Sequence, residues 1–283
     1  MQNMNRWLYR IIADIGQFVV TVRMRLTRLC LIGIGVIGSI SGFSARTQAG
    51  QLPDIIEKIK PAIVGIGTYQ RTRTPPAVFR GTGFVIGDGL HVLTNAHVLP
   101  VAIDKSKYEV LAVFSRDGKK QTVRQAVEIA KDESHDVALL RIGGSPLPSV
   151  RLGDSAKVRE GEQYAFTGYP IGMVLGLNPV THRGIVSAIS PIAIPAHTAQ
   201  RLNSKIIRRL SEPYDVFQLD ATAYPGNSGS PLYDILSGEV VGIINKVFVQ
   251  ETKENLLERP SGISYAIPIK YAVSLLTENG VKR

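Results

Sequence analysis

The sequence predicts an all-β fold that is divided into two halves. From residue 62 onward, short runs rich in Val and Ile alternate with clusters of Gly, Pro, Asp and Ser, as in many short strands joined by turns. The pattern is interrupted near its middle by residues 143–148 (GGSPLP), which read as a linker. We therefore expect strands at 62–69, 79–86, 91–95, 108–115, 123–130 and 137–142, and again at 162–167, 180–189, 216–221, 229–233, 239–248 and 262–267.

Short helices are expected beside these strands. Residues 51–60 place three isoleucines on one side of a helix, and Pro61 ends it because proline lacks the N–H that another turn would need. Residues 269–279 are expected to close the chain as a second helix. Within 196–210, apolar residues recur every four positions among basic ones, which predicts an amphipathic basic helix on the second half.

Residues 1–49 have the order of regions that is typical of a secretory signal peptide. Three arginines precede the uncharged apolar run 29–43, and Thr47-Gln48-Ala49 follows it, close to the small-x-small pattern of a cleavage site. We therefore expect an exported protein. The alternative is an uncleaved N-terminal anchor with membrane contact, but about 15 apolar residues is short against the ~20 that span a bilayer. If translation began at Met24, the basic region before the apolar run would be residues 24–28, which is the usual length in a signal peptide. We infer Met24 as the alternative start of translation.

The composition limits the classes of partner and chemistry. Hydrophobic residues make up 44% and charged residues 20% of the chain, which is ordinary for a globular protein. The first 49 residues hold six arginines and one aspartate, so they carry half of the net charge of +10. Residues 50–283 are mildly basic and have no Lys/Arg run interleaved with aromatics, so we expect no nucleic-acid partner.

The one cysteine of the chain is Cys30. Residues 50–283 therefore offer neither disulfides nor a cysteine-based metal site.

Three separate segments together indicate a serine nucleophile with its base. Ser228 lies within GNSGSPL (226–232), where the flanking glycines let the backbone aim N–H groups at one point. Upstream, His97 lies in LTNAHV and Asp136 in HDVALL. A serine hydroxyl needs a base such as imidazole, and the imidazole needs a carboxylate to fix its tautomer. The order histidine, aspartate, serine is that of the chymotrypsin group.

The other histidines, at 91, 135, 182 and 197, fit no partner pattern, and we expect them at surface or loop positions.

The chain resembles the trypsin-like serine proteases of the Deg/HtrA family. The resemblance covers residues 52–276 and rests on motifs that occur in the order of the family. These motifs are GTGFVI (81–86), TNAHV (94–98), DVALL (136–140), LGDS (152–155), GIVSA (184–188), DATAYPGNSGSPL (220–232) and YAIP (265–268).

The resemblance implies two six-stranded antiparallel β-barrels of the chymotrypsin/trypsin type with short terminal helices. The N-terminal barrel would occupy 50–148 and carry His97 and Asp136, and the C-terminal barrel would occupy 149–283 and carry Ser228. In this arrangement His97 is the general base and acid, Asp136 orients it, and Ser228 is the nucleophile.

The resemblance also implies the groups around the nucleophile. The backbone N–H groups of Gly226 and Ser228 would form the oxyanion hole. Thr222 would lie at the floor of the primary specificity pocket, where its neutral side chain favours small or medium aliphatic residues over Lys or Arg. Asn227 stands where digestive relatives carry an aspartate, so we expect no ion-pair switch of the zymogen type.

We therefore expect a serine endopeptidase, periplasmic or extracellular in a bacterial-type cell, that acts on protein or peptide substrates without a cofactor or metal. Family members often continue into PDZ domains, but few residues follow the expected closing helix here, so we expect a member that lacks a PDZ domain. Because family members are commonly trimeric, we also expect a homo-oligomer. Two alternatives remain. One is a protease-fold binding or chaperone-like protein with a regulated or silent site, and the other is an esterase.

Overall fold

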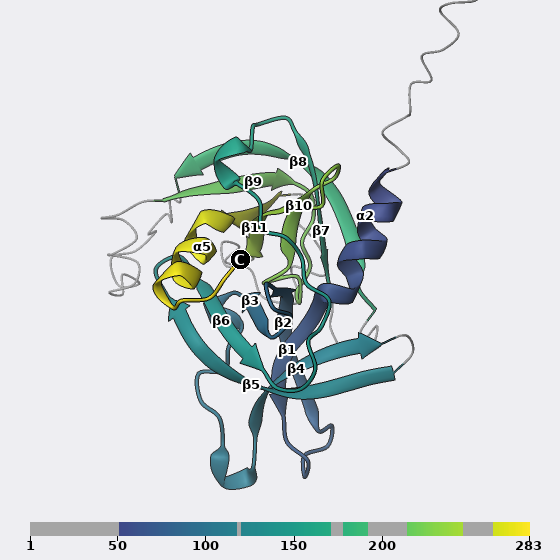
Figure 1. The fold of residues 1–283 in the computed structure, drawn as a ribbon, viewed down its shortest axis with the longest axis vertical. Coiled ribbons are helices and arrows are strands. Elements are labelled where there is room, and N and C mark those ends of the chain that lie inside the picture. Colours follow the sequence, from purple (N-terminus) through teal and green to yellow (C-terminus); the bar gives the residue numbers. More distant parts are fainter. Residues whose placement is uncertain (1–50, 118–119, 171–177, 192–213, 246–262) are drawn as a thin grey trace, which may run out of the picture. The chain divides into compact units, whose positions relative to one another are not determined.

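The computed structural model describes residues 51–117, 120–170, 178–191, 214–245 and 263–283, all within one structural unit, 48–283. These residues form two closed, six-stranded antiparallel barrels and the α-helices α2 and α5 (Figure 1). The prediction of an all-β fold with two barrels and short terminal helices is confirmed.

The first barrel brings the histidine and the aspartate of the expected site to one end. Its neighbouring strands follow the order β1-β2-β3-β6-β5-β4. Strand β3 ends just before His97, and β6 begins just after Asp136. Because Thr94 lies opposite Ala138 in the β3–β6 ladder, these two ends are adjacent. The strands are β1 (Ile63–Tyr69), β2 (Ala77–Ile86), β3 (His91–Thr94), β4 (Val110–Asp117), β5 (Lys120–Asp132) and β6 (Val137–Ile142).

The second barrel carries the serine on the turn between β9 and β10. Its strand order is β10-β11-β12-β9-β8-β7. The Gly229 N–H donates to Ile244 O at 2.9 Å, and the Ile244 N–H donates to Ser230 O at 2.8 Å, so the β11 ladder continues into the turn. The strands are β7 (Gln163–Gly168), β8 (Val180–Pro191), β9 (Asp215–Asp220), β10 (Pro231–Asp234), β11 (Val240–Asn245) and β12 (Ile263–Pro268).

One apolar cluster extends through the first barrel and into the second. It includes fully buried Phe84 and Leu139 from the first barrel and Ile243 and Ile267 from the second. Burial of each such side chain is worth about 1.5–3 kcal/mol relative to exposure. Tyr169, just after β7, adds a hydrogen bond of 2.9 Å from its hydroxyl to Ile63 O in β1. The two barrels therefore share a core that holds their relative position.

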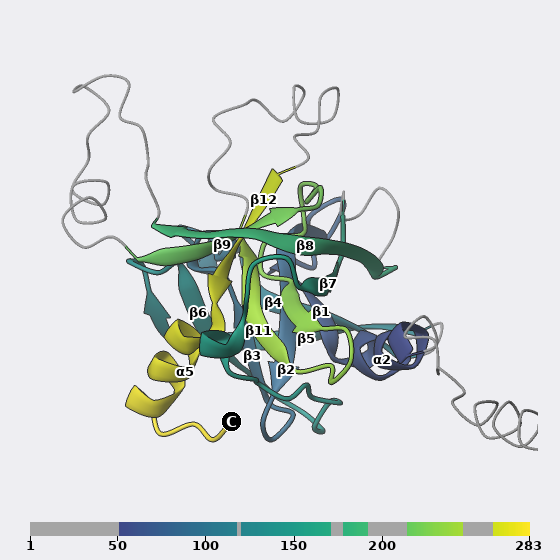
Figure 2. The ribbon, with the colours of Figure 1, turned by 90° about the horizontal axis from the view of Figure 1, so that it is seen from above.

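The helices cover the barrels at two places. Helix α2 (Gln51–Ile59) buries Ile55 and Ile59 in the shared cluster. Helix α5 (Ile269–Glu278) buries Ala272 and Leu276 there and packs against both β6 and β11 (Figure 2). Among the described residues, no helix has the length and hydropathy required to cross a membrane.

The twelve expected strands are all present, with ends that differ by a few residues. Strand β5 runs over Lys120–Asp132 rather than 123–130, because it pairs with β4 and then β6 and shifts register between Glu128 and Ala130. Strand β8 also extends to Pro191. The predictions for 1–49 and for a basic helix within 196–210 lie outside the described residues.

Candidate active site

Asp136 and His97 form a double hydrogen bond. One carboxylate oxygen, Oδ1, accepts from the His97 backbone N–H at 2.8 Å, and the other, Oδ2, lies 2.6 Å from His97 Nδ1. Asp136 is 3% exposed and has a φ of 57°, a left-handed conformation that aspartate tolerates better than most residues. The carboxylate therefore holds the imidazole in one orientation and leaves the other ring nitrogen, Nε2, to act on a substrate or nucleophile.

The main chain around the pair is also fixed. The carbonyl oxygen of Asp136 accepts hydrogen bonds from the Asn95 side-chain amide at 3.0 Å and from the Ala96 N–H at 3.2 Å. On the other side of His97, the guanidinium of Arg80 donates to Val98 O at 2.8 Å. The 3₁₀ turn that carries His97 is thus anchored to the start of β6 and to β2.

Asn245 is a site residue that the sequence analysis missed. It is the last residue of β11 in the second barrel, is 1% exposed, and donates from Nδ2 to Asp136 Oδ2 at 2.8 Å. The Asp136 carboxylate therefore receives a third hydrogen bond, from the barrel that carries Ser228. No motif around residue 245 gives this contact, because it joins residues 109 positions apart.

Replacement of Asn245 by alanine should lower kcat about 10- to 100-fold, because a hydrogen bond to a buried charged group is worth roughly 1.5–3 kcal/mol. The loss should fall on kcat rather than on KM, since Asn245 acts through Asp136 and His97. Steady-state kinetics on fluorescent casein would measure it. Asn279→Ala is the matched control, because its amide bonds only Leu275 O at the end of α5. Equal kinetics for the two variants would contradict the role of Asn245.

Ser228 lies on a turn that only glycine can shape. Gly226 and Gly229 have φ values of 101° and 87°, which other residues rarely adopt. A Cβ at Gly229 would also overlap the carbonyl oxygen of Thr82 in the first barrel. The Thr82 N–H donates to Ser228 O at 2.8 Å, so the main chain of Ser228 is bonded directly to strand β2.

The same close approach places Ser228 beside the histidine turn. A Cβ at Gly81 would lie 2.9 Å from Ser228 O and 2.7 Å from a methyl carbon of Val98, the residue after His97. Gly81 is therefore enclosed between the nucleophile turn and the histidine turn. No hydrogen bond joins the Ser228 and His97 side chains within the described part of the chain. In substrate-free enzymes, such catalytic hydrogen bonds are often long and tighten on binding.

The two expected oxyanion donors are available. Among the described residues, the N–H groups of Gly226 and Ser228 donate to no other group. The neighbouring Asn227 N–H, by contrast, donates to Tyr224 O at 3.0 Å. Asn227 itself is fully buried and carries no charge. Two free backbone donors, one on each side of Asn227 and close to a serine hydroxyl, are what the stabilisation of a tetrahedral oxyanion requires.

Thr222 lies in the segment between β9 and the Ser228 turn and is half-buried. Its two neighbours are fixed by buried Ser264 on β12, whose hydroxyl donates to Ala221 O at 2.6 Å and accepts from the Ala223 N–H at 2.8 Å. The sequence analysis did not identify Ser264. Lys246, which follows Asn245, lies outside the described residues.

The sequence analysis gave the remaining histidines no partner and expected them at surface or loop positions. His135 does lie in the turn between β5 and β6, but three of these histidines have partners that the sequence did not indicate. His91 bonds Asp88 at 2.8 Å. His135 bonds Asp132 and stacks on Tyr271 at 3.9 Å between ring centroids. Burial alone would raise the pKa of Asp132, but hydrogen bonds from His135 and from nearby N–H groups hold this pKa below its usual value.

His182 is half-buried and stacks on Phe166 at 4.9 Å between ring centroids. Burial lowers its pKa. His197 lies outside the described residues.

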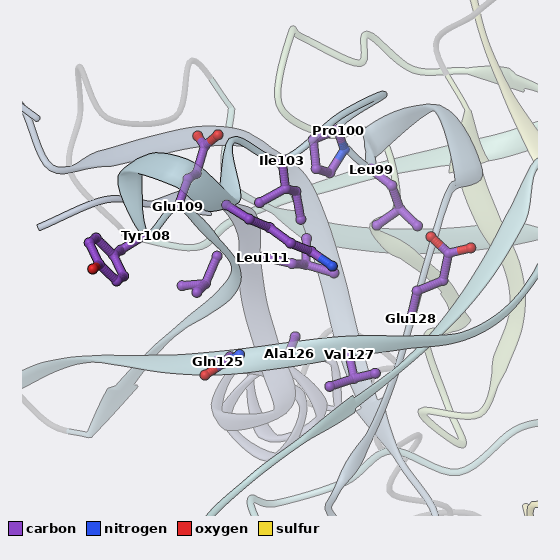
Figure 3. Close-up of a pocket in the computed structure, with 12 residues that line it drawn as sticks. Leu99, Pro100, Ile103, Tyr108, Glu109, Leu111, Gln125, Ala126, Val127 and Glu128 are labelled. Atoms are coloured by element: carbon purple, nitrogen blue, oxygen red, sulfur yellow. The ribbon is translucent and has the colours of Figure 1, made fainter.

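A hollow lies on the first barrel (Figure 3). Its volume is about 490 Å³, and its wall begins at Leu99, two residues after His97. Neither histidine nor serine contributes to its described lining, so the candidate chemistry stays at Ser228. The lining residues are Leu99, Pro100, Ile103, Lys105, Tyr108, Glu109, Val110, Leu111, Gln125, Ala126, Val127 and Glu128.

Comparison with known proteins agrees with this geometry. Residues 81–243 match the family model of the trypsin-like peptidase domain. Serine protease HTRA1A of Danio rerio is 35% identical over 240 residues, which cover 83% of this chain and 43% of that protein. A probable periplasmic serine endoprotease DegP-like of Marinomonas sp. (strain MWYL1) is 29% identical over 295 residues, covering 89% of this chain and 55% of the relative. The chain thus spans about half the length of these curated relatives.

Solved structures agree as well. The HtrA-type protease AlgW with tripeptide superposes with a TM-score of 0.56 at 26% identity, covering 80% of this chain and 62% of AlgW. Deg5 superposes with a TM-score of 0.58 at 24% identity, over 81% of this chain and 93% of Deg5, which supports the fold. The chain belongs to the trypsin-like peptidase domain family, and its relatives are Deg/HtrA proteases.

Proposed function

We propose that this chain is a serine endopeptidase in which Ser228 is the nucleophile, His97 the general base and acid, and Asp136 the group that orients His97. The observation that carries the proposal is the double hydrogen bond between Asp136 and His97, joined through Asn245 to the barrel that carries Ser228. This arrangement fixes the tautomer of His97 so that Nε2 can accept a proton.

The steps follow from these positions. As Ser228 Oγ attacks the carbonyl carbon of a peptide bond, His97 Nε2 takes the hydroxyl proton. The negative oxygen of the tetrahedral intermediate then accepts hydrogen bonds from the N–H groups of Gly226 and Ser228. His97 returns the proton to the leaving amine, and an acyl-enzyme remains on Ser228. Water, activated by the same imidazole, attacks the acyl group and releases the second product.

Cleavage of casein by the purified protein tests this function most simply. The proposal requires fragments from the wild-type chain and none from Ser228→Ala at the same concentration. A wild-type chain that leaves casein intact and is also inert to peptides would contradict it.

We further propose that Thr222 makes the primary specificity pocket neutral, so that small or medium aliphatic residues are preferred before the cleaved bond. The support is its place just before the Ser228 turn, with both neighbours fixed by Ser264. Cleavage of a peptide library should show this preference, and Thr222→Asp should shift it toward Lys and Arg, because a buried carboxylate favours a cation. A strong wild-type preference for Arg would contradict the assignment.

We also propose that residues 1–49 direct export, so that the protease domain acts in the periplasm or outside the cell. The support is the basic, apolar and small-residue order of this segment, together with relatives named as periplasmic. An uncleaved anchor in the membrane is the alternative for the same residues. Assembly into a homo-oligomer, a trimer by analogy with the family, is the matching proposal for quaternary structure.

A further inference from the structure

We propose that Thr82, on β2 of the first barrel, is a positioning residue for the oxyanion hole. Its hydroxyl holds the carbonyl of Gly226 and so fixes the peptide group between Gly226 and Asn227. This inference rests on the proposed function and deepens it, because it says how one barrel sets the oxyanion donors of the other.

The hydrogen bonds of Thr82 connect it to both sides of the nucleophile turn. Its Oγ1 donates to Gly226 O at 2.7 Å and accepts from the Tyr169 N–H at 3.0 Å. Its backbone N–H donates to Ser228 O at 2.8 Å, and its carbonyl accepts from the Thr94 hydroxyl at 2.7 Å. Thr82 is 0% exposed. A hydroxyl has a single proton to donate, and here that proton is committed to Gly226.

The peptide group between Gly226 and Asn227 is thereby held at both ends. Thr82 binds its carbonyl oxygen, and its N–H donates to Tyr224 O at 3.0 Å. Gly226 has a φ of 101°. Glycine adopts positive and negative φ about equally well, so the sequence of the turn alone does not fix the direction of the Gly226 N–H. The Gly226 N–H belongs to the preceding peptide group, between Pro225 and Gly226. Fixing the Gly226–Asn227 peptide group anchors the other side of Gly226 and so restricts the rotation that would turn this N–H away.

Glycines around Thr82 allow strand β2 to lie close to the turn that carries Ser228. A Cβ at Gly229 would overlap Thr82 O, and a Cβ at Gly81 would lie 2.9 Å from Ser228 O. Thr82 Oγ1 also lies 3.0 Å from where a Cβ at Gly168 would be. The glycines at 81, 168 and 229 therefore leave the room that lets a hydroxyl on β2 reach the turn.

The variants that test the inference separate the hydroxyl from the shape of the side chain. Thr82→Val keeps the shape but removes the hydroxyl, and Thr82→Ser keeps the hydroxyl but removes the methyl. Thr68→Val is the matched control, since Thr68 is also buried in the first barrel but its hydroxyl accepts from Arg73 at 3.1 Å. Thr82→Ala repeats the test if the valine variant does not fold, and thermal unfolding identifies the folded variants.

The first measurement is the rate at which a fluorophosphonate probe labels Ser228, taken over a range of probe concentrations. We expect Thr82→Val to lower the maximal rate about 10- to 100-fold with little change in the half-saturating concentration, because the partly buried Gly226 carbonyl loses the hydroxyl that donates to it. Thr82→Ser and Thr68→Val should label close to the wild-type rate. An equal loss in the serine and valine variants would overturn the inference, because the hydroxyl would then not be the cause.

The second measurement does not depend on activity. Amide hydrogen exchange at Asn227 should be about tenfold faster or more in Thr82→Val and unchanged in Thr82→Ser and Thr68→Val, because the peptide has lost one of its two anchors. An unchanged exchange rate at Asn227 in Thr82→Val would overturn the inference, whatever the rate of fluorophosphonate labelling. A wild-type chain that does not label at Ser228 would count against the proposed function instead, while the exchange comparison would still decide whether Thr82 holds the turn.

Discussion

Ser228→Ala is expected to lower kcat on casein by about 10⁴- to 10⁶-fold while the protein stays folded. The alanine side chain has no oxygen that could form the acyl-enzyme, and the histidine and aspartate alone cannot replace that covalent step. The fold should survive, because the bonds that hold the turn come from the backbone and from Thr82.

The measurement is the release of fluorescent peptides from labelled casein, with circular dichroism of both proteins as the check on folding. Ser274→Ala is the matched control, since its exposed hydroxyl bonds only Lys270 O within α5. A Ser228→Ala protein that cleaves casein at the rate of the control would remove the nucleophile from the account.

Asp136→Asn is expected to lower kcat by about 10⁴-fold near neutral pH, because the amide no longer fixes the tautomer of His97. The carboxylate now accepts from three donors, which are the His97 N–H, the His97 ring and the Asn245 amide. An asparagine has only one acceptor oxygen, so at least one of these donors would face the new NH₂ group. The backbone should keep its place, since asparagine also tolerates the φ of 57° found here.

Asp132→Asn is the control for Asp136→Asn. Asp132 is also an aspartate paired with a histidine, His135, and it is the last residue of β5, four residues before Asp136. Hydrogen bonds from His135 and nearby N–H groups outweigh burial and keep the pKa of Asp132 below its usual value, so it too is held as a carboxylate. We expect the Asp132 variant to keep kcat within a few-fold of wild type, as measured on the same casein substrate. Similar losses at both positions would mean that the effect of Asp136→Asn is structural.

The strands and the pairing of His97 with Asp136 could be predicted from the sequence because their signals are local. Val- and Ile-rich runs between turn residues mark each strand, and glycines at 226 and 229 mark a turn that no other residue forms easily. The order of His97, Asp136 and Ser228 added a pattern that chance rarely produces. The structure then brings His97 and Asp136 together through the pairing of β3 with β6.

The residues that support the site could not be predicted, because their roles exist only after the barrels have packed. Asn245 reaches Asp136 from the other barrel, and the Thr82 hydroxyl reaches Gly226 across 144 positions of sequence. Both sit in ordinary strand patterns, where a buried polar side chain gives no local sign of its partner. The ring contacts of His135 with Tyr214 and Tyr271 were missed for the same reason, since both tyrosines lie in distant segments.

The central claim is that Ser228 is an activated nucleophile in this chain. It is tested most directly by treating the folded protein with a fluorophosphonate probe and mapping the adduct by mass spectrometry. The account predicts one adduct per chain, on the peptide that contains Ser228, and its loss in His97→Ala. An adduct on another residue, or none on folded wild-type protein, would contradict it.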